Sequence, residues 1–252
     1  MIPRIIHLCW FGKGKMTRQI ESCLDSIHAL SAKGYRVEIW DESRYDVMKS
    51  PIVADAYEKR RWSLVSNYVR LDVLRQYGGI YLDTDIEVVK PFDDLLEHEL
   101  FLGFMWDCNL GTAVIGAVPD HPVVRGILSV YDNVPGSFRS PNNDTFTEYF
   151  LEHVPEFKLT GKEQALGNGV HVYDKYAFEH PSFLTRQNYT IHHFEQSWKR
   201  GSKAKAYAKA AVIQFGSLWL YRKYVCHKSL KISPFYDVYR RQLAGERAFA
   251  GT

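Results

Sequence analysis

Residues 62–87 read WSLVSNYVRLDVLRQYGGIYLDTDIE and carry the most informative pattern in the chain. The part over 62–77 is apolar on most faces and has one narrow polar stripe at helical spacing, formed by Ser63, Ser66, Asn67 and Arg70. Because burying Arg70 without a partner would be costly, the stripe predicts a helix whose polar face lines a cavity. An exposed stripe on a half-buried helix is the alternative.

A double glycine at 78–79 separates this helix from a short apolar strand that starts at residues 80–82 and ends in acidic residues. Successive side chains of a strand point to opposite faces, so Asp83 and Asp85 are expected on one face, about 6–7 Å apart, with Thr84 pointing away. Two carboxylates this close repel each other unless a cation or a shared proton compensates. The pattern therefore favours a site for Mg²⁺ or Mn²⁺ and a diphosphate-bearing substrate.

The N-terminal third of the chain predicts one βαβ unit. Residues 5–9 form an apolar run and residues 35–40 alternate between apolar and charged, which is typical of strands. Between them, apolar residues recur every three or four positions over 20–30, which predicts an amphipathic helix that ends near Gly34. The unit favours a parallel sheet covered by helices. The loop FGKG (residues 11–14) completes neither the dinucleotide fingerprint nor the P-loop.

The composition is that of an ordinary globular chain. With 252 residues, 46% hydrophobic and 24% charged, it excludes disordered, collagenous and disulfide-framework proteins and predicts one core with small appendages. The four cysteines form no CxxC pair, so no zinc clip or thioredoxin-like motif is expected. The first apolar run is too short for a signal peptide and no stretch of 18 apolar residues occurs, from which we expect a cytoplasmic protein.

Positive charge is concentrated at the end of the chain. Residues 199–252 hold twelve Lys or Arg against two acidic residues, a net charge of +10, which leaves −7 for residues 1–198. We expect a catalytic domain over 1–198 and a basic, largely helical extension over 199–252 packed on it. The aromatic residues within this extension favour peripheral contact with the inner face of a membrane, although a solvated helical face is the alternative. No nucleic-acid-binding motif is present, so nucleic acid is not an expected partner.

Two stretches carry a resemblance to a known family. SNYVRLDVLRQYGGIYLDTDIEVVKPFDDLL (residues 66–96) and IPRIIHLCWFG (residues 2–12) resemble DXD-containing glycosyltransferases related to fungal initiating α-mannosyltransferases and bacterial capsular polysaccharide sugar transferases. The glucosyltransferase domain of the large clostridial toxins is similar at a greater distance. Later in the chain the resemblance thins to pieces such as HHFEQSW (residues 192–198).

The resemblance implies both a fold and an activity. The expected fold is α/β: a GT-A-like single nucleotide-binding Rossmann-type domain with a mixed central sheet and helical additions. The expected activity is that of a metal-dependent retaining hexosyltransferase that uses Mn²⁺ or Mg²⁺. It would move a sugar from a UDP- or GDP-linked donor to a saccharide or lipid-linked acceptor in surface polysaccharide synthesis.

Roles on the donor side follow from the same resemblance. Trp10 would stack on the nucleotide base, and Arg70 would grip the donor sugar or its phosphate through paired donors. Ser66 and Asn67 would contact the donor. The family usually has Asp at the position of Asn67, and the amide keeps the hydrogen bonds but loses the charge, which puts the donor preference in doubt.

The metal site implied by the resemblance includes a late segment of the chain. Asp85 would ligate the metal directly, and Asp83 would contact the ribose and a metal-bound water. His192 would complete the metal shell; because His193 is adjacent and would face the other way on a strand, only one of the two can reach the ion. The same late segment adds Ser197 and Trp198 as donor-binding residues.

Asn142 and Asn143 are expected in a loop. There they would line the acceptor side of the site. Turn chemistry explains asparagine in a loop equally well.

Two other functions remain open from the sequence. A haloacid dehalogenase-like phosphatase also ends a strand in two Asp residues, but that pattern favours Thr or Val where this chain has Glu87, and its strand normally opens the fold. A non-catalytic nucleotide-sugar binding module is the other alternative. The crowded carboxylates of Asp83 and Asp85, together with Arg70, favour catalysis.

Overall fold

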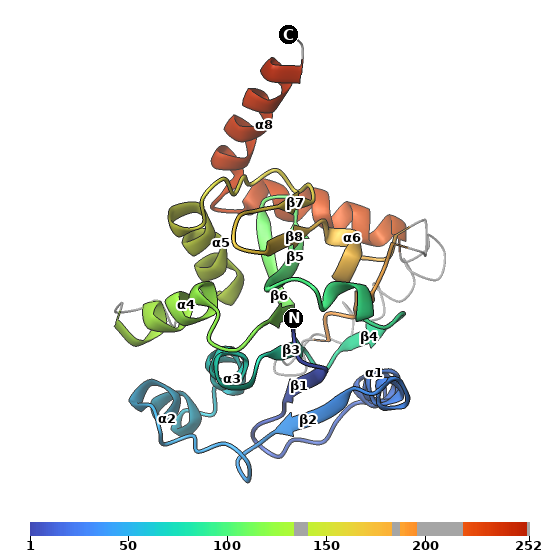
Figure 1. Cartoon of the computed structure of the whole chain (residues 1–252), viewed down its shortest axis with the longest axis vertical. Helices are drawn as coiled ribbons and strands as arrows, with labels where there is room; N and C mark the ends of the chain where they lie inside the picture. Colours follow the sequence, from blue (N-terminus) through green and yellow to red (C-terminus); the bar gives the residue numbers. More distant parts are fainter. Residues whose placement is uncertain (134–140, 183–186, 196–218, 251–252) are drawn as a thin grey trace.

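The computed structural model describes residues 1–133, 141–182, 187–195 and 219–250, and it centres on a seven-stranded mixed sheet (Figure 1). In spatial order the strands are β2 (Arg36–Trp40), β1 (Ile5–Cys9), β3 (Gly79–Leu82), β6 (Asn109–Ala117), β5 (Leu100–Trp106), β8 (Val170–Tyr173) and β7 (Gln164–Ala165). Strand β1 is parallel to β2 and β3, whereas β6 is antiparallel to both β3 and β5. The predicted α/β fold with a mixed central sheet and helical additions is confirmed.

The predicted N-terminal βαβ unit is also confirmed. Helix α1 (Arg18–His28) follows β1, starts at Thr17, whose hydroxyl accepts the amide of Ile20 at 3.3 Å, and buries the apolar face that the spacing indicated. A short 3₁₀ turn (Ala29–Lys33) continues it and ends at Gly34, whose φ of 83° lies in the left-handed region that glycine adopts without strain. Strand β2 then pairs in parallel with β1, residue for residue from Ile5 opposite Arg36.

Helix α3 occupies the range that the sequence predicted. It runs over Trp62–Tyr77, after the shorter α2 (Pro51–Glu58). Gly78 and Gly79 follow with φ of 61° and 105°, and a Cβ at Gly79 would lie 2.6 Å from the carbonyl oxygen of Ile5 on β1. The double glycine therefore ends the helix and lets β3 start directly against β1.

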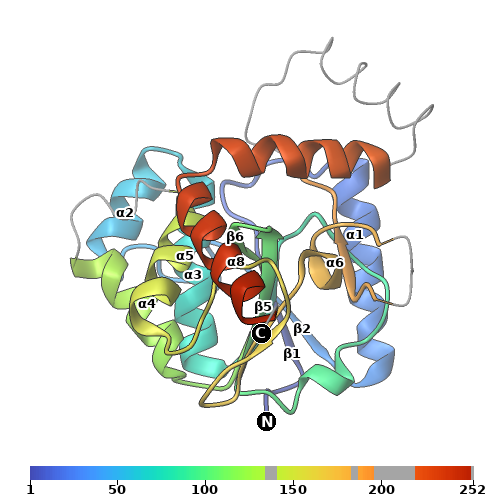
Figure 2. The same ribbon diagram turned by 90° about the horizontal axis from the view of Figure 1, so that it is seen from above.

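Helices cover both faces of the sheet. Figure 2 shows α2, α3, α4 (Pro122–Asn133) and α5 (Asn142–His153) on one side, and α1 and α6 (Lys175–Phe178) on the other. Alternate residues of β3 enter the two cores: Tyr81 packs with the first group of helices, whereas Ile80 and Leu82 pack with the second. A small sheet of β4 (Ile86–Val88) and β9 (Thr190–His192) lies beside the large one.

The described part of the C-terminal segment is helical. A helix spans residues 219–232, and α8 (Tyr236–Ala250) follows and projects from the body in Figure 1. Phe235, between them, is buried in the core on the α3–α5 side. The predicted boundary between residues 198 and 199 lies outside the described residues and stays a prediction. Among the residues described, no helix combines the length and apolar character needed to cross a membrane.

Candidate functional site

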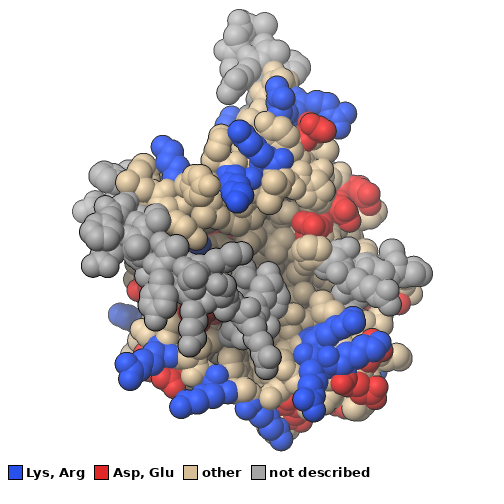
Figure 3. Space-filling view, turned by 180° about the vertical axis from the view of Figure 1, so that it is seen from behind, with Lys and Arg blue, Asp and Glu red and all other residues tan. Residues whose placement is uncertain are grey.

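A cavity of about 830 Å³ opens where β1, α3 and the acidic turn meet. Its described lining residues are Cys9, Trp10, Phe11, Gly14, Lys15, Arg60, Arg61, Trp62, Ser63, Leu64, Ser66, Arg70, Tyr81, Asp83, Thr84, Asp85, Met105, His192, Phe194 and Glu195. Figure 3 shows a hollow on the face turned away in Figure 1, with Lys and Arg side chains at several places around it. The carboxyl ends of β1 and β3 lie at the cavity, the edge at which open α/β sheets bind ligands.

The acidic residues lie in a turn and not on a continuous strand, which corrects the sequence prediction. Strand β3 ends at Leu82, the carbonyl of Asp83 accepts the amide of Ile86 at 3.2 Å, and β4 starts at that residue. The chain leaves the large sheet here because β4 pairs with β9 instead. The tight turn gathers Asp83, Thr84 and Asp85 at the cavity, so Thr84 lines it as well and does not point away.

The polar stripe of α3 faces the cavity, as predicted. Ser63, Ser66 and Arg70 line it. Arg70 is 5% exposed, yet its guanidinium is fully engaged: Nη1 donates to the carbonyl of Thr112 at 2.7 Å and Nη2 donates to Asn67 Oδ1 at 3.0 Å. Asn67 therefore holds Arg70 in place.

Arg70 neutralises the first acidic residue of the turn. Its Nη2 lies 3.2 Å from Asp83 Oδ1, and its guanidinium packs over the ring of Tyr81, whose hydroxyl donates to the same carboxylate oxygen at 2.7 Å. Burial alone would lower the pKa of Arg70, but the nearby Asp83 carboxylate raises it, so Arg70 stays charged. One of the two acids is thus balanced without a metal.

Asp85 is held by the late segment of the chain. Its Oδ1 lies 3.3 Å from His192 Nε2, its Oδ2 accepts the amide of Glu195 at 2.8 Å, and its carbonyl accepts the amide of His193 at 3.0 Å. Burial would raise the pKa of Asp85, but the His192 ring and the Glu195 amide outweigh it and lower the pKa. Asp85 is therefore ionised at neutral pH.

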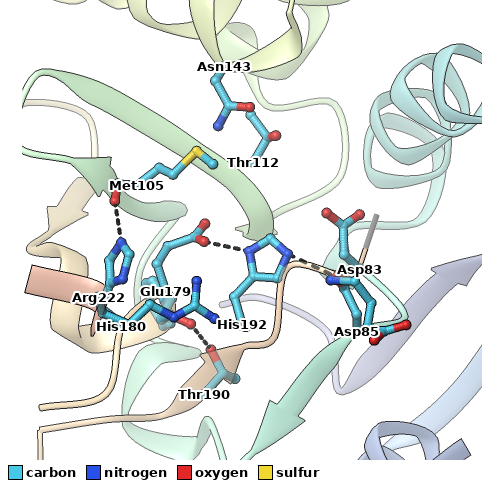
Figure 4. A network of polar contacts seen from close by, with 12 residues as sticks. Asp83, Asp85, Met105, Thr112, Asn143, Glu179, His180, Thr190, His192 and Arg222 are labelled. Atoms are coloured by element: carbon cyan, nitrogen blue, oxygen red, sulfur yellow. Dashed lines mark hydrogen bonds and ion pairs between the residues drawn. The ribbon is translucent and has the colours of Figure 1, made fainter. Parts of the chain in front are cut away.

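The ring of His192 lies between two carboxylates, as Figure 4 shows. Its Nδ1 is 2.6 Å from Glu179 Oε2, and its Nε2 faces Asp85. Burial alone would lower the pKa of His192, but the carboxylates of Glu179 and Asp85 raise it to about 10. The proton that the ring carries in this state occupies a place that a cation could take.

Asp83, Asp85 and His192 form a set of three potential metal ligands. One ligand atom from each lies within 4.8 Å of the other two. Two carboxylates with one imidazole suit Mn²⁺, and Mg²⁺ in an oxygen-rich shell. The residues present thus fit a hard divalent ion, and the structure distinguishes the two neighbouring histidines, because His193 Nε2 is turned to Glu87 Oε2 at 2.7 Å.

Several residues at or near the site are not marked by any of the sequence patterns described above. Glu179 and Arg222 come from distant segments, and Arg222 donates to the carbonyl of His192 at 2.8 Å. Three cations also line the cavity without an acidic partner among the described residues: Lys15, Arg60 and Arg61. The pair Arg60-Arg61 directly before α3 is the one local signal that could have been noticed.

The remaining predicted residues fall in different places. Trp10 lines the cavity and donates its Nε1 to the carbonyl of Gly14 at 3.0 Å. Ser197 and Trp198 lie outside the described residues. Asn142 and Asn143 lie in the first turn of α5, so the predicted loop is wrong.

The side chains of both asparagines form hydrogen bonds within the protein. Asn142 accepts the hydroxyl of Tyr131, and Asn143 donates to the carbonyl of Leu110 at 2.6 Å. Side chains that hold the start of a helix in this way explain why a turn-like sequence continues as a helix. Neither residue is among those described as lining the cavity, and their acceptor-side role stays a prediction.

Residues 15–102 match the family model of the glycosyltransferase sugar-binding region containing a DXD motif. This stretch, about a third of the chain, is similar to the DXD-containing glycosyltransferases. An uncharacterized glycosyltransferase of Acanthamoeba polyphaga mimivirus is 27% identical over 175 residues, 62% of this chain and 66% of the relative. A mannosyl phosphorylinositol ceramide synthase of Saccharomyces cerevisiae is 30% identical over 131 residues, 48% of this chain and 32% of the relative.

Among solved structures, the PaToxG glycosyltransferase aligns with a TM-score of 0.47 at 18% identity, over 61% of this chain and 70% of that one. The chain spans only about a third of the length of the yeast relatives that it matches. The resemblance stated from residues 66–96 is confirmed, because the matched region includes all of them.

Proposed function

We propose that the protein is a metal-dependent, retaining glycosyltransferase that moves a sugar from a UDP- or GDP-linked donor to a saccharide or lipid-linked acceptor in surface polysaccharide synthesis. The observation that carries this proposal is the meeting of Asp83, Asp85 and His192 beside a cavity of about 830 Å³. A cavity of this size accommodates a nucleotide-sized ligand. The family match over residues 15–102 supports the same class of reaction.

The site residues discussed above each have a role in the proposed reaction. Asp83, Asp85 and His192 would hold Mn²⁺ or Mg²⁺, which would supply charge neutralisation to the departing diphosphate. Trp10, at the end of β1, offers its ring to the base. Arg70 fixes Asp83 and stays charged beside the position where negative charge develops.

The cationic side of the cavity suits phosphate groups. Lys15, Arg60 and Arg61 line it, and none of them is paired with an acid among the described residues. These cations can bind the donor diphosphate or a phosphate on a lipid-linked acceptor. Relatives named as inositol phosphoceramide mannosyltransferases, such as one of Schizosaccharomyces pombe, support an acceptor with a phosphate group.

Retention of the anomeric configuration is proposed to occur by attack of the acceptor on the face that the diphosphate leaves. Among the described cavity residues, Glu195 is the one carboxylate outside the metal cluster. Its Oε2 accepts the hydroxyl of Thr17 at 3.2 Å, and its amide is bound to Asp85. Glu195 is thus engaged with Thr17 and Asp85, which leaves no dedicated nucleophile among these described residues.

We also propose peripheral contact with the cytoplasmic face of a membrane through the helix at residues 219–232. Leu220 and Tyr224 on this helix are 53% and 65% exposed, and Lys223 and Lys228 accompany them. Apolar and cationic side chains together favour an anionic lipid surface. Reversing the charge with K223E and K228E should release the protein from anionic vesicles, and unchanged vesicle binding would contradict the contact. The lysines at 203, 205 and 209 lie outside the described residues.

A screen of donor binding and hydrolysis across UDP- and GDP-sugars, each with and without Mn²⁺, tests the proposed reaction. The expected result is donor binding and slow sugar release that both require Mn²⁺. Nucleotide binding that is independent of metal, with no hydrolysis, would instead indicate a binding module. Phosphate release from simple esters without sugar release would indicate the phosphatase.

A further inference from the structure

Glu179 is a buried carboxylate directly behind the candidate metal ligands. It follows α6, is 2% exposed, and lies on the side of His192 that faces away from the acidic turn. Its Oε2 is 2.6 Å from His192 Nδ1, and its carbonyl accepts the amide of His192 at 3.2 Å. Side chain and backbone thus fix both the ring and the main chain of the same histidine.

The packing around Glu179 leaves this carboxylate little freedom. A Cβ at Gly111 on β6 would overlap Glu179 Oε1, so glycine at this position makes room for the buried acid. Arg222, on the helix at 219–232, donates to the carbonyl of His192 at 2.8 Å and adds a third constraint. His192 is therefore held from two distant parts of the chain, its ring by the Glu179 carboxylate and its main chain by Glu179 and Arg222.

We infer that Glu179 is a positioning residue that orients His192 so that its Nε2 faces the space shared with Asp83 and Asp85. This inference rests on the proposed function, because it assigns a role at the same metal site. A carboxylate that accepts the Nδ1 proton of an imidazole leaves the Nε2 lone pair free for a metal ion and makes it a better donor. Such an outer partner commonly changes metal affinity about 10- to 100-fold.

The neighbouring histidine supplies a matched control. His193 Nε2 is 2.7 Å from Glu87 Oε2, which is almost the same Glu–His contact as that of Glu179 with His192. The Glu87 side chain is 47% exposed, and His193 does not line the described cavity. Removal of the Glu87 carboxylate therefore changes a similar hydrogen bond without touching the candidate metal ligands.

The test is the Mn²⁺ affinity of the full chain, measured by electron paramagnetic resonance on the wild type, E179A, E179Q, E87Q and D85A. We expect E179A to bind Mn²⁺ about 10- to 100-fold more weakly and to lose the imidazole nitrogen coupling in spin-echo spectra of the bound ion. E179Q keeps an acceptor of the same shape but not its charge, so its loss should be intermediate. E87Q should match the wild type.

Different results separate this inference from the function on which it rests. Mn²⁺ affinity and nitrogen coupling in E179A and E179Q equal to those of the wild type would overturn the role of Glu179, as would an equal loss in E87Q. If E179A does not fold, E179Q alone decides the question, because its shape is preserved. A wild type that binds Mn²⁺ no better than D85A would contradict the proposed metal site itself, and this inference with it.

Discussion

Residues 62–85 form one side of the cavity as a single stretch of chain, whereas another side consists of His192, Phe194 and Glu195, held from behind by Glu179 and Arg222. We refer to the first as the contiguous wall and to the second as the assembled wall. The contiguous wall supplies Asp83 and Asp85, and the assembled wall supplies His192. The complete set of candidate metal ligands therefore depends on long-range packing as well as on the local DXD sequence.

The backbone of the assembled wall includes a non-glycine residue with a positive φ angle. The α3 part of the contiguous wall, residues 62–77, has none. Phe194 has φ of 52°, a conformation that costs a non-glycine residue about 1 kcal/mol or more. Its ring stacks on His192 at 3.9 Å between centroids, and the Arg222 guanidinium lies 4.3 Å from the ring centre. The strained conformation of Phe194 is therefore held by packing from the distant helix at 219–232. Because that strain is released on opening, the assembled wall should open at a lower free energy than the contiguous wall.

The largest expected effect is the loss of turnover on replacing Asp85, the acid that the two walls share. Asp85→Ala removes a candidate metal ligand and the acceptor for the amide of Glu195. Because metal-assisted charge stabilisation contributes several kcal/mol, sugar transfer should fall by about 10³-fold or more. Asp25→Ala, an exposed acid on α1, serves as the control. Full transferase activity of Asp85→Ala with Mn²⁺ present would refute the metal role of Asp85.

A smaller effect is expected on stability when the contiguous wall loses its buried cation. Arg70→Met leaves the carbonyl of Thr112 without its donor and removes the cation beside Asp83, which keeps the hydroxyl of Tyr81. It should lower the free energy of unfolding by about 3 kcal/mol. Arg75 on the same helix also pairs with a buried acid, Asp72, at 2.9 Å. Asp72 keeps further hydrogen bonds from Tyr45, Lys49 and Gln76 after that loss.

Arg75→Met is therefore the matched control, with an expected cost of about 1 kcal/mol. Denaturant unfolding of both variants gives the comparison. Equal losses of unfolding free energy in the two variants would mean that the Arg70–Asp83 pair contributes no more than an exposed ion pair. The stability of the contiguous wall would then not depend on Arg70.

The next prediction concerns the assembled wall. Arg222→Met removes the donor to the carbonyl of His192 and the cation over Phe194. We expect a loss of about 2 kcal/mol in the local opening free energy, read as faster hydrogen exchange of the Glu195 amide, which is bound to Asp85. Lys223→Met on the same helix should leave that rate unchanged. Exchange that is slow in both variants would show that Arg222 does not hold the assembled wall.

The effect that is smallest at neutral pH is a pH dependence in the sheet beneath the contiguous wall, which appears only on acidification. His7 on β1 donates from Nε2 to the carbonyl of Gly78 at 2.8 Å and accepts Trp40 Nε1 at Nδ1 at 3.0 Å, which fixes a neutral ring. Burial lowers the pKa of His7 to about 4. Between pH 6.5 and 4 the unfolded chain binds a proton that the folded chain does not, so stability falls as the pH falls.

The comparison with His7→Gln isolates this dependence. The wild type should lose about 1.4 kcal/mol per pH unit relative to the variant below pH 6.5, and nothing above it. Urea unfolding at several pH values measures the difference. Parallel curves for the two proteins would show that His7 binds its proton equally well in the folded and unfolded chains.

The contrast between the walls also explains what the sequence could predict. The βαβ unit, helix α3, its polar stripe and the double glycine depend on local periodicity and backbone conformation, and they were predicted within a residue or two. The acidic turn was predicted as a strand because DTDIE alternates, yet β4 changes its partner to β9. Pairing across more than a hundred residues leaves no local pattern.

The residues of the assembled wall show the same limit. Glu179 and Arg222 have no periodicity or motif that marks them, because their function arises from burial against His192. Asn142 was expected in a loop since asparagine favours turns, and the hydroxyl of Tyr131 stabilises it at the start of a helix instead. Which of His192 and His193 faces the acids also depended on the register of β9 with β4.

Crystals grown with Mn²⁺ and UDP or GDP, measured at the manganese absorption edge, test the central claim most directly. We expect one anomalous peak bounded by Asp83, Asp85 and His192, with the nucleotide diphosphate beside it and the Trp10 ring against the base. A nucleotide bound with no manganese among these three side chains, or manganese bound at another place in the chain, would contradict it.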